Sequence, residues 1–161
     1  MSSNPQLHVV LVEPEIPQNA GNVGRTCLAI GARLHLVGQL GFSLEEKQLK
    51  RAGLDYWQNV DLAVHASWDV FIKDVPPGAH MFFFSTRGRE RFWDTPLAAP
   101  VYLVFGSESR GLPPALYRRH DDSLIRLPMS GDVRSLNLAT AAGIAAYDAA
   151  RRLNLFPTIA P

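Results

Sequence analysis

The sequence predicts an α/β protein, a parallel sheet flanked by helices, and three apolar runs carry that prediction. Leu7–Val12, Met81–Phe84 and Val101–Phe105 are apolar almost throughout, as is typical of strands buried on both faces. Segments with helical spacing separate them, and such alternation indicates a parallel sheet. A length of 161 residues fits one domain, so we expect a single domain over residues 1–161.

The first half of the chain supplies three strands and three helices. After the first strand, Val23, Cys27 and Ile30 recur near one helical turn, which predicts a helix over 21–30 that Gly31 ends. The remaining elements are a strand over 33–37, a helix over 44–52, a weak strand over 61–64 and a helix that Ser67 caps and that runs to about Val75.

The second half adds the strands 81–84 and 101–105, a short helix over 114–118, a sixth strand over 123–127 and a long helix over 135–154. Ser135 is the expected cap of the long helix. The small residues of this helix form one face: Ala139, Ala142, Gly143, Ala146 and Ala150. Because a small-residue face lets another helix approach closely, we expect it to pack on a second subunit in a homodimer.

The amino-acid composition limits the cellular compartment and the binding partners that we expect. Apolar residues make up 47% and charged residues 19%, and no apolar run is long enough for a membrane span. The sequence has no secretory signal, only one cysteine, and no Cys/His cluster with the spacing of a zinc site, so we expect a cytoplasmic protein without a metal.

The net charge is only +1, but arginine outnumbers lysine thirteen to three. That bias fits RNA binding and equally fits a GC-rich genome.

The first candidate loop, residues 13–25, follows the first strand. Asn19 and Asn22 supply donors and acceptors, and Arg25 is expected in the first turns of the next helix, where an anion would bind. The glycines lack the dinucleotide-binding spacing. Alternatively, the segment is only a turn and Arg25 pairs with Glu13 or Glu15.

The second loop, residues 105–113, follows the strand 101–105. Gly106 at the strand end leaves room for a ligand such as adenosine to lie against the backbone. The two serines do not form a nucleophile elbow. Glu108 could act as a base, but we favour a role in holding the loop by accepting backbone N–H bonds.

The third loop, residues 126–137, leads into the long helix. Ser135 serves either as a helix cap alone or as part of a site. Tyr147, further along that helix, is more often a core aromatic with a tethered hydroxyl than a catalytic group.

Together the three loops resemble the three motifs of the SPOUT methyltransferases. The matching segments are 19–25, 105–113, 127–129 and 135–138. The opening 13–19 and the segment 50–56 are similar to the branch of that family that methylates the 2′-oxygen of cytidine or uridine in tRNA. The similarity covers nearly the whole chain.

The resemblance implies a fold with a C-terminal trefoil knot, a homodimer with a site built from both chains, and S-adenosyl-L-methionine as cofactor. It implies a tRNA substrate, the wobble cytidine or modified uridine of leucine tRNAs. The implied cofactor-binding residues are Phe84, Gly106, Leu127 and Ser135, and the implied catalytic residues are Arg25, Ser135 and Tyr147. The implied substrate-binding or loop-organising residues are Asn19, Asn22, Glu108, Arg110 and Asn137.

This sequence departs from the common family pattern at Ala20, Ser107 and the bulky Phe84, which affects the shape of the pocket. Two alternatives stay open. One is a methyltransferase acting on ribosomal RNA. The other is an RNA-binding or assembly protein of the same fold without turnover.

Overall fold

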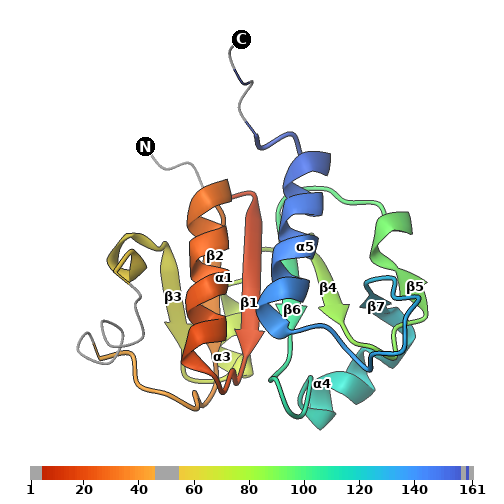
Figure 1. Cartoon of the computed structure of the whole chain (residues 1–161), viewed down its shortest axis with the longest axis horizontal. Coiled ribbons are helices and arrows are strands. Elements are labelled where there is room, and N and C mark those ends of the chain that lie inside the picture. Colours follow the sequence, from red (N-terminus) through yellow and green to blue (C-terminus); the bar gives the residue numbers. More distant parts are fainter. Residues whose placement is uncertain (1–4, 46–54, 157–158, 160–161) are drawn as a thin grey trace.

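A seven-stranded parallel sheet runs through the molecule (Figure 1). The computed structural model describes residues 5–45, 55–156 and 159. The strands are β1 (Leu7–Val12), β2 (Arg33–Val37), β3 (Leu62–His65), β4 (His80–Phe84), β5 (Glu90–Arg91), β6 (Val101–Phe105) and β7 (Leu124–Arg126). Their order is β3-β2-β1-β6-β4-β7-β5 and every pair is parallel. The predicted α/β class with a parallel sheet is confirmed, while the trefoil knot stays a prediction.

The three apolar runs occupy the centre of this sheet. Every residue of β1 and β6 is buried, which explains why neither run alternates with polar residues. The two-residue β5 was not predicted, because so short a segment carries no periodic pattern.

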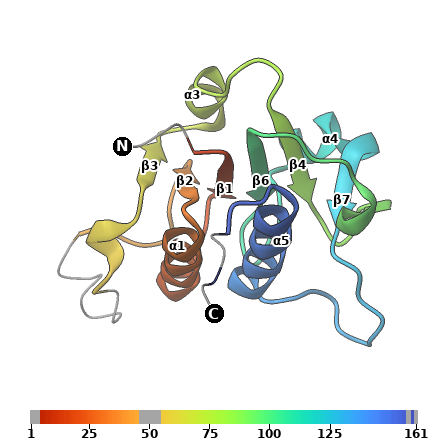
Figure 2. The ribbon, with the colours of Figure 1, turned by 90° about the horizontal axis from the view of Figure 1, so that it is seen from above.

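Helices cover both faces of the sheet (Figure 2). The longer ones, α1 (Pro17–Ile30) and α5 (Leu138–Arg152), lie side by side on one face and share its apolar core. The shorter α3 (Trp68–Lys73) and α4 (Pro114–Arg119) contribute Phe71 and Leu116 to the core on the other face. The described residues also form short 3-10 turns at Trp57–Asn59, Phe92–Asp94 and Asp121–Ser123.

Two helix starts were predicted wrongly. Helix α1 begins at Pro17 and not at Gly21, because proline suits the first helical position, where its missing N–H costs nothing. Helix α5 begins at Leu138, and its cap is Asn137, whose side chain accepts from the backbone N–H of Thr140 at 3.2 Å. Ser135 is therefore not the cap.

The other helices fit the prediction more closely. Ser67 caps α3 by accepting from the N–H of Val70 at 3.2 Å, as expected. Most of the helix predicted over 44–52 lies outside the described residues, and Leu44 and Glu45 are not helical.

The small-residue face of α5 is used inside the chain, which corrects our reason for expecting a dimer there. Ala142, Ala146 and Ala150 are buried in the core beneath the helix, and α5 packs directly on α1. The close neighbour that these small residues admit is the chain's own sheet and helix. A dimer therefore needs a different surface.

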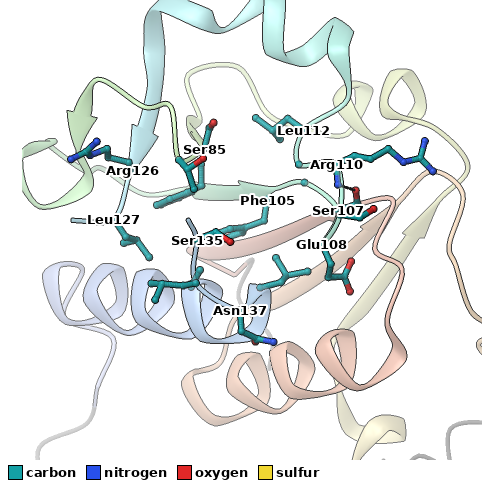
Figure 3. A pocket seen from close by; sticks show the side chains of 18 of the residues that line it. Ser85, Phe105, Ser107, Glu108, Arg110, Leu112, Arg126, Leu127, Ser135 and Asn137 are labelled. Carbon is teal, nitrogen blue, oxygen red and sulfur yellow. Dashed lines mark hydrogen bonds between the residues drawn. The ribbon is translucent and has the colours of Figure 1, made fainter. Parts of the chain in front are cut away.

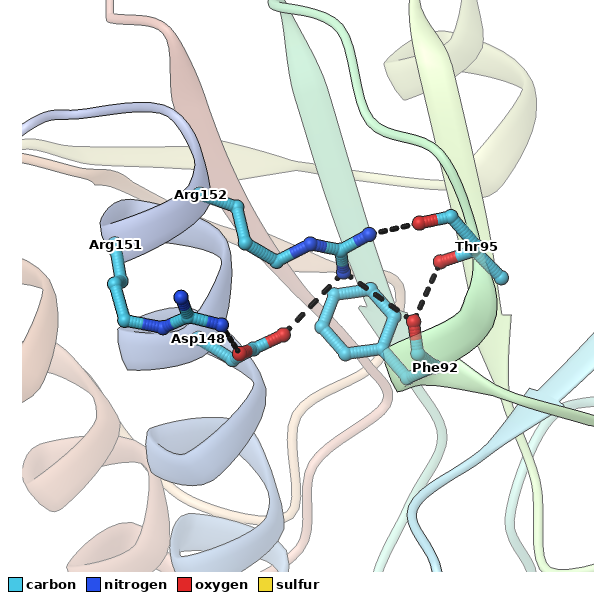
Figure 4. A network of polar contacts seen from close by, with 5 residues as sticks. All are labelled: Phe92, Thr95, Asp148, Arg151 and Arg152. Carbon is cyan, nitrogen blue, oxygen red and sulfur yellow. Dashed lines mark hydrogen bonds and ion pairs between the residues drawn. The ribbon is translucent and has the colours of Figure 1, made fainter.

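An arginine near the end of α5 ties that helix to the irregular segment before β6 (Figure 4). Arg152 donates to the carbonyl oxygens of Phe92 and Thr95, lies over the Phe92 ring at 5.3 Å, and pairs with Asp148 at 3.3 Å. The Phe92 carbonyl also accepts from the N–H of Thr95 at 3.1 Å and from its hydroxyl at 2.6 Å, so the guanidinium adds a donor there and supplies the donor for the Thr95 carbonyl.

Candidate active site

A pocket of about 500 Å³ opens at the carboxyl ends of β6, β4 and β7, the edge where open α/β sheets bind ligands (Figure 3). Its walls come from the loop after each of these strands and from the start of α1 and α5. A volume of this size is usual for a small-molecule site. The second and third predicted loops meet here, together with the loop after β4.

Glu108 holds the second loop against the start of α1. Its Oε1 accepts from the N–H of Glu15 at 2.8 Å, and its Oε2 accepts from the N–H of Ile16 at 2.8 Å and from Asn19 Nδ2 at 3.1 Å. Glu15 returns the contact, because its Oε1 accepts from the N–H and the hydroxyl of Ser109. These bonds lower the pKa of the Glu15 carboxyl.

The hydrogen bonds of Glu108 are those of a residue that holds a loop. Three donors occupy its two oxygens, so this carboxylate is poorly placed to accept a proton from a substrate.

Two asparagines extend this connection to the third loop. Asn137 Nδ2 donates to Asn19 Oδ1 at 3.1 Å, while Asn137 Oδ1 caps α5. Asn19 is buried, so both ends of its amide are bonded out of contact with bulk water. Glu108, Asn19 and Asn137 thus form one network that joins the three segments around the pocket, and we name it the loop clip.

Gly106 lines the pocket, but the reason for a glycine there differs from the predicted one. A Cβ at this position would lie 1.9 Å from the carbonyl carbon of Gly111 and 2.1 Å from the nitrogen of Leu112. The space is filled by the chain's own backbone, where Ser107 and Gly111 exchange two hydrogen bonds of 2.9 Å. A side chain at position 106 would therefore displace the loop itself.

The inner wall of the pocket is apolar and the rim is polar. Phe84 stacks on Phe105 with ring centroids 4.6 Å apart, and Leu127 is also buried beside the pocket. Ser135 lines the rim with its side chain exposed. An apolar wall next to open backbone groups and a hydroxyl fits a nucleoside cofactor.

Comparison with known proteins identifies the family. A model of the SpoU rRNA Methylase family matches residues 6–147. The chain belongs to the SpoU methylase family. The resemblance found in the sequence is thereby confirmed.

Similar proteins cover almost the whole chain. The tRNA (cytidine(34)-2′-O)-methyltransferase of Burkholderia pseudomallei (strain 1106a) is 47% identical over 90% of this chain and 94% of its own length. The putative tRNA (cytidine(34)-2′-O)-methyltransferase of Bacillus subtilis (strain 168) is 45% identical over 92% and 94%.

Two solved structures are also similar. One, described as giving structural insights into the 2-OH methylation of C/U34 on tRNA, has a TM-score of 0.85 and 51% identity over 93% of this chain and 97% of that one. An AdoMet-bound rRNA methyltransferase from Sinorhizobium meliloti has a TM-score of 0.80 and 29% identity, and covers 95% of this chain but 59% of that one.

Three predicted site residues lie outside the pocket of this SpoU methylase. Arg25 sits in the third turn of α1, exposed, with its guanidinium 5.5 Å from the centre of the Tyr56 ring. Asn22 is exposed on the same helix. Tyr147 is 48% exposed on α5 and contacts Phe156, so it is not the core aromatic that we favoured.

Neither Glu13 nor Glu15 forms an ion pair with Arg25 within the described residues, so the alternative of a salt bridge that secures the turn is wrong. The expected place of Arg25 in the first turns of the helix was wrong too, because α1 starts earlier than predicted.

The sequence analysis missed the loop after β4 as part of the site. Ser85, Arg87, Tyr117 and Arg126 line the pocket together with the predicted Arg110. Ser85 directly follows an apolar strand, which is the signal that could have identified it. Tyr117 gave no signal, because α4 is too short for a periodic pattern.

None of the helices that the described residues form is long and apolar enough to cross a membrane. The same residues contain no group of three side chains arranged to hold a metal ion.

Proposed function

We propose that this SpoU methylase transfers a methyl group from S-adenosyl-L-methionine to the ribose 2′-oxygen of nucleotide 34, the wobble position, in tRNA. The observation that carries the proposal is the loop clip, which joins three distant segments around one pocket. Relatives named for this reaction match 90% to 92% of the chain at 45% to 47% identity, which supports the substrate.

The chain's residues fit the cofactor. Phe84 and Leu127 would form an apolar wall for it, and the backbone around Gly106 would supply hydrogen bonds. The cofactor supplies an electrophilic methyl group on a sulfonium. The protein has to place the ribose hydroxyl in line with that methyl, and placement alone can contribute roughly 7 to 11 kcal/mol to lowering the barrier.

Arg25 would position the ribose and an adjacent phosphate. A guanidinium offers five N–H donors and no acceptor, so a bidentate contact suits Arg25 better than accepting the hydroxyl proton. Ser135 stands at the pocket rim, where its hydroxyl can bind the substrate or the cofactor. Tyr147 would act from the exposed face of α5.

Because Arg25 and Tyr147 lie outside the pocket of their own chain, we propose a homodimer in which they serve the partner's site. The exposed faces of α1 and α5 carry large apolar side chains at Leu28, Ile144 and Tyr147. The two helices lie side by side, and their first residues line the pocket (Figure 2). A two-fold dimer through this face presents each Arg25 to the other chain.

We further propose that residues 1–161 act as one domain in the cytoplasm, where tRNA is modified. Support comes from the single sheet, and from the one cysteine, which is buried and free.

A ribosomal RNA substrate is the second candidate, favoured by the description of the family and by the Sinorhizobium relative. That relative is less similar and has additional length, whereas the tRNA relatives match at least 90% of this chain and 94% of their own length. The intact pocket and loop clip argue against the non-catalytic alternative.

Methyl transfer to purified RNA tests the proposal. With wild-type protein and S-adenosyl-L-methionine, leucine tRNAs are expected to gain a 2′-O-methyl group at nucleotide 34, measured as transfer of a radiolabelled methyl group from the cofactor to the RNA. The matched control is the same tRNA with a 2′-deoxynucleotide at position 34. Methylation of ribosomal RNA alone would establish the second candidate, and no transfer to either RNA would contradict both.

A further inference from the structure

The loop after β4 is held rigidly at the mouth of the pocket. The N–H of Ser85 donates to the carbonyl of Ile125 at 2.9 Å, and the N–H of Gly88 closes a turn on the carbonyl of Ser85 at 3.0 Å. A Cβ at Gly88 would lie 2.5 Å from the backbone of Ile125, so only glycine allows this close approach. Arg87 therefore has a fixed backbone.

The side chain of Arg87 is also held in place. Its guanidinium lies over the ring of Tyr117, 5.0 Å from the centroid, and the Tyr117 hydroxyl is 3.0 Å from Ser85 Oγ. The same Oγ accepts from the N–H of Arg87 at 3.1 Å. We name Ser85, Arg87 and Tyr117 the rim platform. Arg87 is exposed, so the surface of its guanidinium away from Tyr117 is available to a ligand.

Two more arginines stand around the same mouth. Arg110 projects from the tip of the second loop and Arg126 from the end of β7, on opposite sides of the pocket with Ser85 between them (Figure 3). Both are exposed. The carboxylate of Glu108 is already bonded to three donors. The net charge of the whole chain is only +1, yet three arginines, Arg87, Arg110 and Arg126, line this one pocket.

We infer that the rim platform is a stacking subsite for one nucleobase of the substrate RNA next to the reacting nucleotide, and that Arg110 and Arg126 contact its flanking phosphates. The inference rests on the proposed function and adds to it residues that position the RNA. A guanidinium pre-placed on an aromatic ring offers a flat cationic surface, which single-stranded RNA bases use for stacking. If Arg87 only contacted a phosphate through its charge, it would not need Tyr117 beneath its guanidinium.

Arg87→Lys tests the stacking directly, since lysine keeps the charge and loses the plane. The probe is an anticodon stem-loop RNA, followed by fluorescence anisotropy, together with a series of the same RNA carrying one abasic site at each loop position in turn. We expect Arg87→Lys to weaken binding of the intact stem-loop about tenfold. For the RNA that lacks the stacked base, wild type and Arg87→Lys should bind with the same affinity.

Two tyrosine variants refine the test. Tyr117→Leu should lose binding like Arg87→Lys, because the ring is gone, whereas Tyr117→Phe keeps the ring and should bind normally. The matched control is Arg89→Lys, since Arg89 is two residues away, pairs with Asp121 at 3.7 Å and does not line the pocket. Arg110→Ala and Arg126→Ala should each lower the slope of log affinity against log salt by about 0.7.

Several outcomes would overturn the inference. Arg87→Lys could bind the stem-loop as tightly as wild type. It could lose the same factor on every abasic RNA, which is the behaviour of a phosphate contact. It could instead lose affinity for S-adenosyl-L-methionine in calorimetry while RNA binding stays normal. By contrast, a wild-type protein that methylates no tRNA contradicts the proposed function. If the wild-type protein methylates tRNA normally and Arg87→Lys leaves RNA binding unchanged, only the role of the rim platform is contradicted.

Discussion

The Nδ1 atom of His8 lies 2.9 Å from the Nε2 atom of His35, and both rings are buried on adjacent strands β1 and β2. His35 Nδ1 is in turn 3.0 Å from Nε2 of the buried His65, and His8 Nε2 is 3.1 Å from the carbonyl oxygen of Pro5. That carbonyl only accepts, so His8 donates to it, accepts from His35, and His35 accepts from His65. With neutral rings, each histidine thus donates to the next group in the order His65, His35, His8 and the Pro5 carbonyl.

We predict that this histidine chain makes the fold less stable as the pH falls from about 7 to 5. Burial lowers the pKa of His8 from 6.5 to about 4 and that of His35 to about 3. Between these values and 6.5 the unfolded chain binds more protons than the folded one, so the free energy of unfolding decreases with decreasing pH. Each histidine contributes at most about 1.4 kcal/mol per pH unit.

Urea unfolding at pH 8, 7, 6 and 5 measures this slope. His80→Gln, outside the hydrogen-bonded chain, should keep the wild-type slope, while His35→Phe should flatten it. An identical pH dependence in His35→Phe and wild type would contradict the assignment.

The two neighbouring arginines of α5 provide a matched pair for stability. Arg151 and Arg152 both pair with Asp148, but the Arg151 side chain is 71% exposed and that of Arg152 only 19%. Arg152→Met should lower the free energy of unfolding by about 1 to 3 kcal/mol, because the Thr95 carbonyl loses its side-chain donor and the half-buried Asp148 carboxylate loses one of its two partners. Arg151→Met should stay within about 0.5 kcal/mol of wild type. Equal losses in the two variants would argue against the anchoring role (Figure 4).

Glu108→Gln separates the loop-holding role from catalysis. The amide has one acceptor oxygen where the carboxylate has two, so at least one of the three donors loses its partner. We expect unfolding to become easier by about 1 to 3 kcal/mol and the affinity for S-adenosyl-L-methionine to fall. Calorimetry and thermal melting measure the two effects, with Glu90→Gln on the exposed β5 as control. A drop in turnover with unchanged stability and cofactor affinity would instead indicate a base.

The sheet could be predicted from the sequence because its signal is local. Strands buried on both faces, such as β1 and β6, are marked by apolar runs alone. The start of α1 could not be placed, since Pro17 is compatible with both a loop and a first helical turn. The same ambiguity moved Asn19 from a loop into the helix and Arg25 from its first turns to its third.

The contacts of the site were harder to predict than its loops. Glu108 and Glu15 are 93 positions apart, and nothing in either loop indicates that Glu108 accepts from the N–H of Glu15. Gly106 was correctly placed at the pocket, but the backbone that fills its missing side chain comes from Gly111, which only folding brings there. Ser135 was the predicted cap of the long helix, but the helix starts at Leu138 and its cap is Asn137.

A substitution on each side of α5 distinguishes its internal face from a dimer face. Tyr147→Glu places a charge on the exposed face, and we expect it to convert a homodimer to monomers in light scattering with little loss of stability in the monomer. Ala146→Leu overfills a buried position and should destabilise the fold by about 1 to 3 kcal/mol instead. A wild-type monomer at micromolar concentration that methylates tRNA fully would contradict the proposed dimer.

The last prediction concerns Arg25 and its place in the partner's site. Arg25→Ala should abolish methyl transfer at saturating RNA and cofactor, while thermal stability and cofactor affinity stay near wild type, because the side chain is exposed and lies outside the pocket of its own chain. Arg25→Lys should rescue poorly, since the planar fork is lost.

Mixing two inactive variants shows whether Arg25 acts in the pocket of its own chain or in that of the partner. Gly106→Val disrupts the pocket through its clash with the Gly111 backbone and leaves Arg25 intact. If Arg25 acts on the partner's pocket, a mixture of Arg25→Ala and Gly106→Val should regain activity, because each mixed dimer combines the intact pocket of the first with the intact arginine of the second. If Arg25 acts in its own chain, both sites of the mixed dimer lack one part and the mixture stays inactive. Mixed dimers purified with two different affinity tags make the comparison direct, and full activity of Arg25→Ala alone would remove the arginine from the reaction.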